Sequence, residues 1–265
     1  MATSPPHNPI VTLTTDFGQR DGYVGAMQGV ILDICPGATI STISHDIPPQ
    51  DIQAAAFVLY QAFNYYPRQT IHCMVVDPGV GSERHAVAMR TSHGVFVGPD
   101  NGVFSLILNA TEVLEAVTLT NSRFQLARVS ATFHGRDIFS PACAHLAKGV
   151  SLAELGPPVV ELTRLDFGAR LHPDEARIIH IDHFGNLILD LTAHDIAGVR
   201  QVAFKIGHTM IRSLGRTFSD VDEGELLAYV GSSRDHVEIG LRNGNAAKAL
   251  GLHLNDVVQV VRELD

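Results

Sequence analysis

The sequence predicts an α/β protein: an N-terminal, mostly parallel sheet with flanking helices, followed by a smaller antiparallel, β-rich domain. Over about the first 165 residues, strand-like and helix-like segments alternate, which is typical of a parallel sheet covered by helices. After about residue 170, short strand-like runs follow one another closely, as in a small antiparallel sheet or barrel. Gly156-Pro157-Pro158 and His172-Pro173 lie between the two patterns and continue regular structure poorly.

We therefore place a boundary near residue 170, with an N-terminal α/β domain over residues 10–168 and a C-terminal β-rich domain over residues 175–265. Residues 1–9 are expected to be disordered. They lack the basic and apolar regions of a secretion signal, and no apolar run in the chain reaches the length of a membrane span.

Apolar or β-branched runs bounded by turn residues predict N-terminal strands over residues 10–14, 39–43, 70–76, 86–90 and 113–119. Helices are predicted over residues 23–34, 51–65 and 138–148, where Pro36-Gly37, Pro48-Pro49 and Gly149 supply stop or start signals. The C-terminal strands are expected over residues 177–181, 187–191, 199–206, 226–230, 237–241 and 257–262.

Composition narrows the classes of partner. The 265 residues are 45% hydrophobic and 18% charged, which fits a folded protein with a sizeable core. A net charge of −9 argues against nucleic acid or an anionic membrane as the main partner and is compatible with a cationic small molecule. The three cysteines form no CxxC pair or disulfide framework, so we expect a cytoplasmic protein.

Three polar groups of the N-terminal domain could carry chemistry, because parallel sheets bind ligands at the carboxyl ends of their strands. Asp16 follows the first strand and could accept hydrogen bonds from both hydroxyls of a ribose, although a turn role is the alternative. Asp77 and Arg84 flank a glycine loop and could pair, or form only a surface ion pair. His134 stands at a loop-to-helix junction, where Asp137 would be the N-cap.

The C-terminal domain offers two further segments, Asp182-His183-Phe184-Gly185-Asn186 and the run from Ser232 to Glu238. Both combine carboxylates with amide, hydroxyl or guanidinium groups, and both are equally compatible with ordinary hairpin turns. His180 and His183 are three residues apart but lack a coherent ligand set, so no metal site is expected.

Together these segments resemble the S-adenosylmethionine hydrolase (adenosine-forming) family, also called S-adenosylmethionine hydroxide adenosyltransferases, which is related to a fluorinase and a chlorinase. The resemblance runs from about Val11 to Val261. It rests on TLTTDFG-x-x-DGYVGAM-x-GV, VVDPGVGSER, FVGPDNGVFS, TFHGRDIFSPACAHLA, DHFGNL and EIGLRNGNAAKALGL.

The resemblance implies an N-terminal α/β domain, a C-terminal antiparallel β-barrel-like domain, and a homotrimer with active sites between subunits. It implies catalytic roles for Asp77, Arg84 and His134, and ribose binding by Asp16. The groups implied to hold the methionine portion and the adenine are Asp182, Phe184, Asn186, Phe218, Ser233 and Glu238. Arg234 lies where the related halogenase has an arginine, and its role stays open.

The implied reaction is hydrolysis of S-adenosyl-L-methionine to adenosine and L-methionine by water or hydroxide at the ribose 5′ carbon. Neither a metal nor a cofactor is expected, since the sulfonium is already a good leaving group. A carboxylate at Asp77 would repel a halide, and the span from Arg84 to Phe96 is too short for the extra loop of the fluorinase. A chlorinase-like halogenase and a non-catalytic adenosine or S-adenosylmethionine sensor are the alternatives. Whether Asp77 or His134 accepts the water proton is open at this stage.

Overall fold

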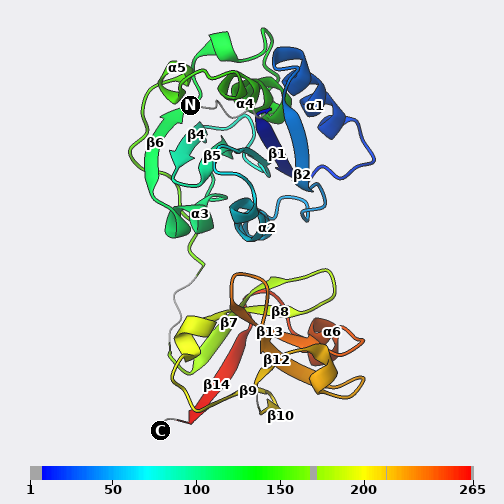
Figure 1. Cartoon of the computed structure of the whole chain (residues 1–265). Helices are drawn as coiled ribbons and strands as arrows, with labels where there is room; N and C mark the ends of the chain where they lie inside the picture. Colours follow the sequence, from blue (N-terminus) through cyan, green and yellow to red (C-terminus); the bar gives the residue numbers. More distant parts are fainter. Residues whose placement is uncertain (1–7, 168–171, 213, 264–265) are drawn as a thin grey trace, which may run out of the picture. The chain divides into compact units, whose positions relative to one another are not determined.

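The computed structural model describes residues 8–167, 172–212 and 214–263 (Figure 1). The chain divides between Leu165 and Asp166 into two compact units. Of the residues expected to be disordered, 1–7 lie outside the described part; Pro9 is described, and its carbonyl oxygen accepts a 2.8 Å hydrogen bond from the Thr39 amide.

The first unit contains one six-stranded sheet. Its strands, in spatial order, are β2 (Thr39–Ser44), β1 (Ile10–Thr15), β3 (Ile71–Val75), β5 (Gly94–Pro99), β4 (Ala86–Thr91) and β6 (Val113–Thr118). The pairs β2–β1, β1–β3 and β3–β5 are parallel, while β4 runs antiparallel to both neighbours. The predicted mostly parallel sheet is confirmed. The sequence missed β5, because it follows β4 as a hairpin and breaks the strand–helix alternation.

Helices cover both faces of this sheet (Figure 1). They are α1 (Tyr23–Ile34), α2 (Ile52–Ala62), α3 (Ser105–Ala110), α4 (Ser140–Ala147) and α5 (Leu152–Leu155). Strand β3 shows the two-sided burial: Cys73 and Val75 pack with residues of α1 and α4, whereas Met74, and Val76 just after the strand, pack with residues of α2 and α3. An all-buried strand between two helix layers is the expected state of a central parallel strand.

The helix expected from residue 138 begins earlier, as a π-helix over Gly135–Phe139 that continues into α4. Asp137 is therefore not an N-cap. Its side chain is fully buried, and it accepts both hydrogen bonds of an Arg136 fork and one from the Ser130 amide at 2.8 Å. The carboxylate thus ties the preceding loop to the helix from inside the π-helix, a role that helix-capping rules do not anticipate.

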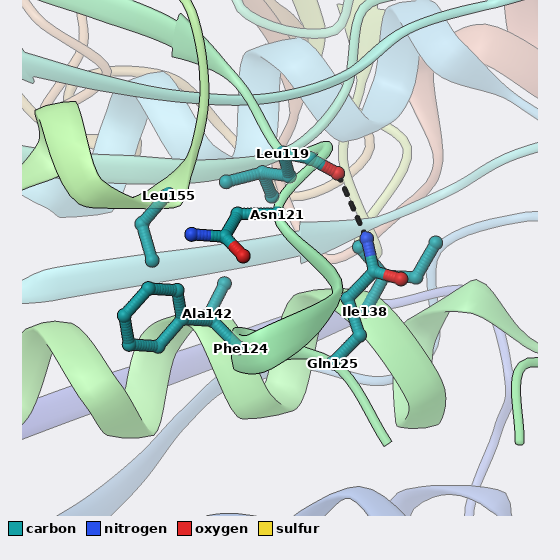
Figure 2. Close-up of a pocket in the computed structure, with 7 residues that line it drawn as sticks. All are labelled: Leu119, Asn121, Phe124, Gln125, Ile138, Ala142 and Leu155. Carbon is teal, nitrogen blue, oxygen red and sulfur yellow. Dashed lines mark hydrogen bonds between the residues drawn. The ribbon is translucent and has the colours of Figure 1, made fainter. Parts of the chain in front are cut away.

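The segment after β6 packs across α4 (Figure 2). The Gln125 side-chain amide donates to the Leu119 carbonyl at 3.0 Å, and Phe124 faces Ala142. The hollow that these residues line has no volume that a water molecule could enter. This packing anchors the chain that leads to His134, and it is not a ligand site.

The second unit contains one eight-stranded sheet. Its strands, in spatial order, are β10 (Thr209–Ile211), β9 (Gln201–Ile206), β14 (Val257–Glu263), β7 (Glu175–Ile181), β8 (Leu187–Thr192), β13 (His236–Leu241), β12 (Leu226–Val230) and β11 (Leu214–Gly215). Neighbouring strands are antiparallel except β11 and β12. Strands β10 and β12 line one hollow although they stand near opposite ends of the sheet, so the sheet curls into a half-barrel around its apolar core. A short helix, α6 (Ala246–Leu250), follows β13. The predicted antiparallel, β-barrel-like class is confirmed.

Candidate active site

A cleft of about 390 Å³ opens at the carboxyl ends of β1 and β3. Asp16 follows β1 directly, Asp77 follows β3 by two residues, and His134 immediately precedes the π-helix. All three line the cleft, which has the size of a small-molecule site. The fold thus brings together three groups that the sequence separates by 61 and 57 residues.

Arg84 joins two of these groups. Its Nε donates to Asp77 Oδ1 at 2.9 Å, and its Nη2 donates to Asp77 Oδ2. The same Nη2 is 2.8 Å from His134 Nδ1. The side chains of Arg84 and Asp77 are only 10% and 6% exposed, so this pair is a nearly buried fork and not the surface ion pair left open by the sequence. The guanidinium also lies 5.4 Å from the centre of the Phe139 ring.

The loop between Asp77 and Arg84 needs glycine at position 81. Gly81 has a φ of +77°, and a Cβ there would lie 2.4 Å from the Ala131 carbonyl oxygen. Only glycine permits this close approach, which sets the loop against the segment that leads to His134.

The imidazole of His134 is held neutral. Burial, and then the charge of Arg84, lower the pKa of His134 below its ordinary value of 6.5. A guanidinium only donates hydrogen bonds, so Nδ1 of the neutral ring must accept and the ring proton resides on Nε2. His134 is therefore a hydrogen-bond donor through Nε2.

Asp16 is fixed by a neighbouring loop. Its Oδ2 accepts a 2.8 Å hydrogen bond from the Gln50 amide, and Gln50 takes a left-handed φ of 67° to deliver it. The described residues offer no second donor to this carboxylate, so Oδ1 is left to accept from a ligand. Asp16 can thus stabilise the local turn through Oδ2 and still bind a ligand through Oδ1.

Three aromatic rings line the same cleft, and the sequence did not single them out as a group. Phe17, Tyr23 and Phe133 contact one another edge to face or tilted, with ring centroids 5.4 to 5.8 Å apart. Tyr23 is 51% exposed. The three rings come from separate loops and a helix start, so no single sequence window contains the cluster.

In the second unit, Asp182 organises the turn between β7 and β8. Its Oδ1 accepts from the amides of Phe184 and Asn186, and its Oδ2 accepts from the Asn186 side chain at 2.8 Å. Asn186 is buried, whereas the Phe184 ring is largely exposed. In this structure the carboxylate of Asp182 is used to shape the turn that presents Asn186 and Phe184.

Glu238, Phe218 and Asn186 come together on one face of β13. The Tyr229 hydroxyl donates to Glu238 Oε2 at 2.8 Å, and burial followed by this carboxylate raises the pKa of Tyr229. The Phe218 ring lies 5.3 Å from the Tyr229 ring. A Cβ at Gly240 would meet Phe218 and Asn186 within 3 Å, so glycine lets both approach the strand. The sequence missed Tyr229, since only the strand register pairs it with Glu238.

Ser233 and Arg234 lie in the tight turn between β12 and β13. The His236 amide donates to the Ser233 carbonyl, and Arg234 and Asp235 have φ values of 53° and 59°. Two consecutive positive φ angles define the hairpin turn that matches the twist of the flanking strands. The segment therefore forms an ordinary hairpin turn, as one of the two alternatives predicted. A role for Ser233 in binding stays a prediction.

Two further properties concern the described residues alone. No group of three or more His, Cys, Asp or Glu side chains among them is placed to hold a metal ion. No helix in the described ranges is long and apolar enough to cross a membrane.

Comparison with known proteins finds matches over most of the chain. The SAM hydroxide adenosyltransferase N-terminal domain matches residues 11–156, and the C-terminal domain of the same name matches residues 176–259. The chain is 38% identical to "(R)-S-adenosyl-L-methionine hydrolase" of Salinispora tropica, over 95% of this chain and 97% of the relative. It is 26% identical to a "Fluorinase" of Actinoplanes sp., over 71% of this chain and 74% of the relative.

The fold also matches a solved structure. The crystal structure of an uncharacterized conserved protein from Thermotoga maritima superimposes with a TM-score of 0.87 and 32% identity, covering 96% of this chain and all of that one. The two matching domains follow the order of the two units described above and span most of the chain. The protein belongs to the SAM hydroxide adenosyltransferase family.

Proposed function

We propose that the protein hydrolyses S-adenosyl-L-methionine to adenosine and L-methionine by attack of water or hydroxide at the ribose 5′ carbon. The observation that carries this proposal is the Asp77–Arg84–His134 network in the cleft that also contains Asp16. Family membership and the hydrolase name of the 38% identical relative support it.

Asp16 is proposed to bind the ribose. Its Oδ2 is already held by Gln50, so Oδ1 would accept from the ribose hydroxyls and fix the sugar at the end of β1. A carboxylate bonded to a neutral diol is a strong acceptor, and its position decides where the 5′ carbon lies.

The attacking water is proposed to lie between His134 and Asp77. His134 would donate a hydrogen bond through Nε2 to one lone pair of the water oxygen. The second lone pair of that oxygen would then be free to attack the ribose 5′ carbon. Asp77 would accept a water hydrogen, since its oxygens keep lone pairs beyond those used by Arg84. Positioning and charge supply most of the rate, because a carboxylate is a weak base toward bulk water.

The proposed step balances without a further reactant. A water oxygen forms the new O–C5′ bond, the C5′–S bond breaks, and its electron pair goes to sulfur to give neutral methionine thioether. The new 5′ oxygen is strongly acidic until it loses a proton, so even a weak base suffices. Asp77 is the proposed acceptor, because neither nitrogen of His134 has a free lone pair in the observed arrangement. No metal or cofactor is needed in this scheme.

We further propose that Asp182, Phe184, Asn186, Phe218, Ser233 and Glu238 hold the methionine portion and the adenine. Each site would be completed by a neighbouring subunit of a homotrimer, as the family resemblance implies. We also propose a cytoplasmic location, supported by three cysteines that are all free and buried.

The proposal is tested with purified protein, S-adenosyl-L-methionine and H₂¹⁸O, in chloride-free and chloride-rich buffers. Hydrolysis at the 5′ carbon yields adenosine with ¹⁸O in its 5′ hydroxyl in both buffers. A product of 5′-chloro-5′-deoxyadenosine would indicate a halogenase, and tight binding without turnover would indicate a sensor. Adenosine without the label would contradict attack by water at this carbon.

A further inference from the structure

The aromatic rings of the cleft differ in which of them can still receive a cation. The Arg136 guanidinium lies 4.9 Å from the centre of the Phe133 ring, and Arg136 does not line the cleft. One face of the Phe133 ring is therefore already covered by a guanidinium that lies outside the cleft. Among the described residues, neither Phe17 nor Tyr23 carries such a cation.

The surroundings of Phe17 and Tyr23 also favour positive charge. Both rings line the cleft with Asp16 and Asp77, and no lysine or arginine of the described ranges lines it with them. The carboxylate of Asp77 is neutralised by Arg84, whereas that of Asp16 has, among the described residues, only a backbone amide as its partner. Tyr23 is about half exposed and lines the cleft, so its ring is accessible to a ligand.

We propose that Phe17 and Tyr23 bind the sulfonium of S-adenosyl-L-methionine by cation–π attraction and thereby set a preference for the charged substrate; this inference rests on the proposed function. A ring face is electron-rich and attracts a cation within about 6 Å of its centre. A neutral thioether gains no such attraction, so the rings distinguish the sulfonium from its demethylated analogue.

The attraction belongs to the ground state of the reaction. As the C5′–S bond breaks, its electron pair neutralises the sulfur, and the charge that the rings attract disappears. An interaction stronger in the ground state than in the transition state lowers KM without raising kcat. Loss of a ring should therefore raise KM and leave kcat unchanged or higher. It also follows that neutral methionine is bound less tightly than the substrate portion from which it came.

The test compares S-adenosyl-L-methionine with S-adenosylhomocysteine, which lacks the positive charge. Tyr23→Leu should raise the KM for S-adenosyl-L-methionine roughly tenfold, the middle of the range for a partly desolvated cation–π contact. The inhibition constant of S-adenosylhomocysteine should change by less than about threefold. Tyr23→Phe keeps the ring and should keep the preference for the cation.

Phe17→Leu is the second variant, so the test does not depend on one substitution folding. Tyr65→Leu is the matched control, because Tyr65 is an exposed aromatic residue, 81% accessible, outside the cleft. Equal losses of affinity for S-adenosyl-L-methionine and S-adenosylhomocysteine would overturn the inference and indicate that the rings only pack against the ligand as apolar groups. An equal loss for free adenosine would overturn it in favour of stacking on the base. If the wild-type protein shows no turnover, the proposed function fails, and calorimetric dissociation constants for the two ligands still test the rings.

Discussion

The Nη2 nitrogen of Arg84 lies 2.8 Å from His134 Nδ1 while the same guanidinium holds Asp77 in a two-pronged ion pair. One side chain therefore links the carboxylate and the imidazole of the cleft. Because the guanidinium only donates, it places the single proton of His134 on Nε2. In the proposed mechanism the two residues therefore have opposite roles toward the attacking water: His134 would donate a hydrogen bond, and Asp77 would accept one.

The first prediction concerns pH. Burial and the charge of Arg84 lower the pKa of His134, so the neutral ring persists to more acidic pH than an ordinary histidine. The kcat/KM of the enzyme should therefore stay level as pH falls to 6.5. It should decrease only at a more acidic pH, where the His134 ring becomes protonated. Arg84→Met removes the guanidinium charge and leaves only burial to lower the pKa of His134. That pKa should therefore move up toward 6.5. NMR titration of the ring measures this without requiring activity. An acidic limb centred above 6.5 in the wild type would contradict the prediction.

The second prediction concerns Asp77. Asp77→Asn keeps the shape of the side chain but removes its charge and with it the proposed acceptor of the water proton. Adenosine formation should fall by at least about 10²-fold, the lower range for a positioned acid–base group, while KM changes much less. Single-turnover kinetics with S-adenosyl-L-methionine provides the measurement. Turnover within about threefold of the wild type would remove Asp77 from the mechanism.

The third prediction concerns Asp16. If Asp16 binds the ribose as proposed, Asp16→Ala leaves two ribose hydroxyls without their partner, at a cost of roughly 1.5–3 kcal/mol for hydrogen bonds to a charged group. The affinities for adenosine and for S-adenosyl-L-methionine should fall together, because both ligands carry the ribose. Asp46→Ala is the matched control, because Asp46 is an exposed carboxylate that does not line the cleft, and it should leave both affinities unchanged. Calorimetry with adenosine decides, and an unchanged dissociation constant in Asp16→Ala would leave Asp16 as a turn residue.

The fourth prediction tests assembly. In a homotrimer with sites between subunits, Asp77→Asn and Asn186→Ala chains should rescue each other. About a quarter of the interfaces in a random mixture would pair two intact halves, because the interface is heterologous. Activity of refolded mixtures should rise well above that of either parent. If mass spectrometry shows mixed trimers and the mixture stays inactive, the site is built within one chain.

The fifth prediction concerns stability. His72 is fully buried in β3, its Nδ1 lies 2.8 Å from Thr12 Oγ1, and its ring stacks on Phe96. Burial lowers the pKa of His72 to about 3. The unfolded chain binds a proton below pH 6.5 and the folded chain does not, so stability falls by about 1.4 kcal/mol per pH unit as pH drops from 6.5 toward 3.

The comparison of wild type with His72→Asn isolates this contribution, because other histidines are common to both chains. Between pH 7 and pH 5 the wild type should lose about 2 kcal/mol more unfolding free energy than the variant. Urea unfolding at the two pH values measures it. Parallel losses in both proteins would show that His72 is not the source.

Much of the first unit could be read from local sequence. Helix α1 has the bounds that were predicted, because its apolar spacing and the following Pro36-Gly37 act within a few residues. Asp16 and Asp77 were placed at strand ends by the same local logic, and both line the cleft. Strand β5 was missed, because a hairpin that completes a mostly parallel sheet depends on pairing with β4 and not on its own periodicity.

The sequence by itself determined the alternation of strands and helices in most of the first unit, the antiparallel class of the second unit, and the residue types that make a nucleoside site recognisable. Tertiary structure alone decided the tautomer of His134, the buried role of Asp137, the aromatic group of Phe17 and Tyr23, and the pairing of Tyr229 with Glu238. The physical reason is range. Turn, cap and periodicity signals act over a few residues, whereas hydrogen bonds, burial and pKa shifts depend on groups that only the folded chain brings within a few ångströms.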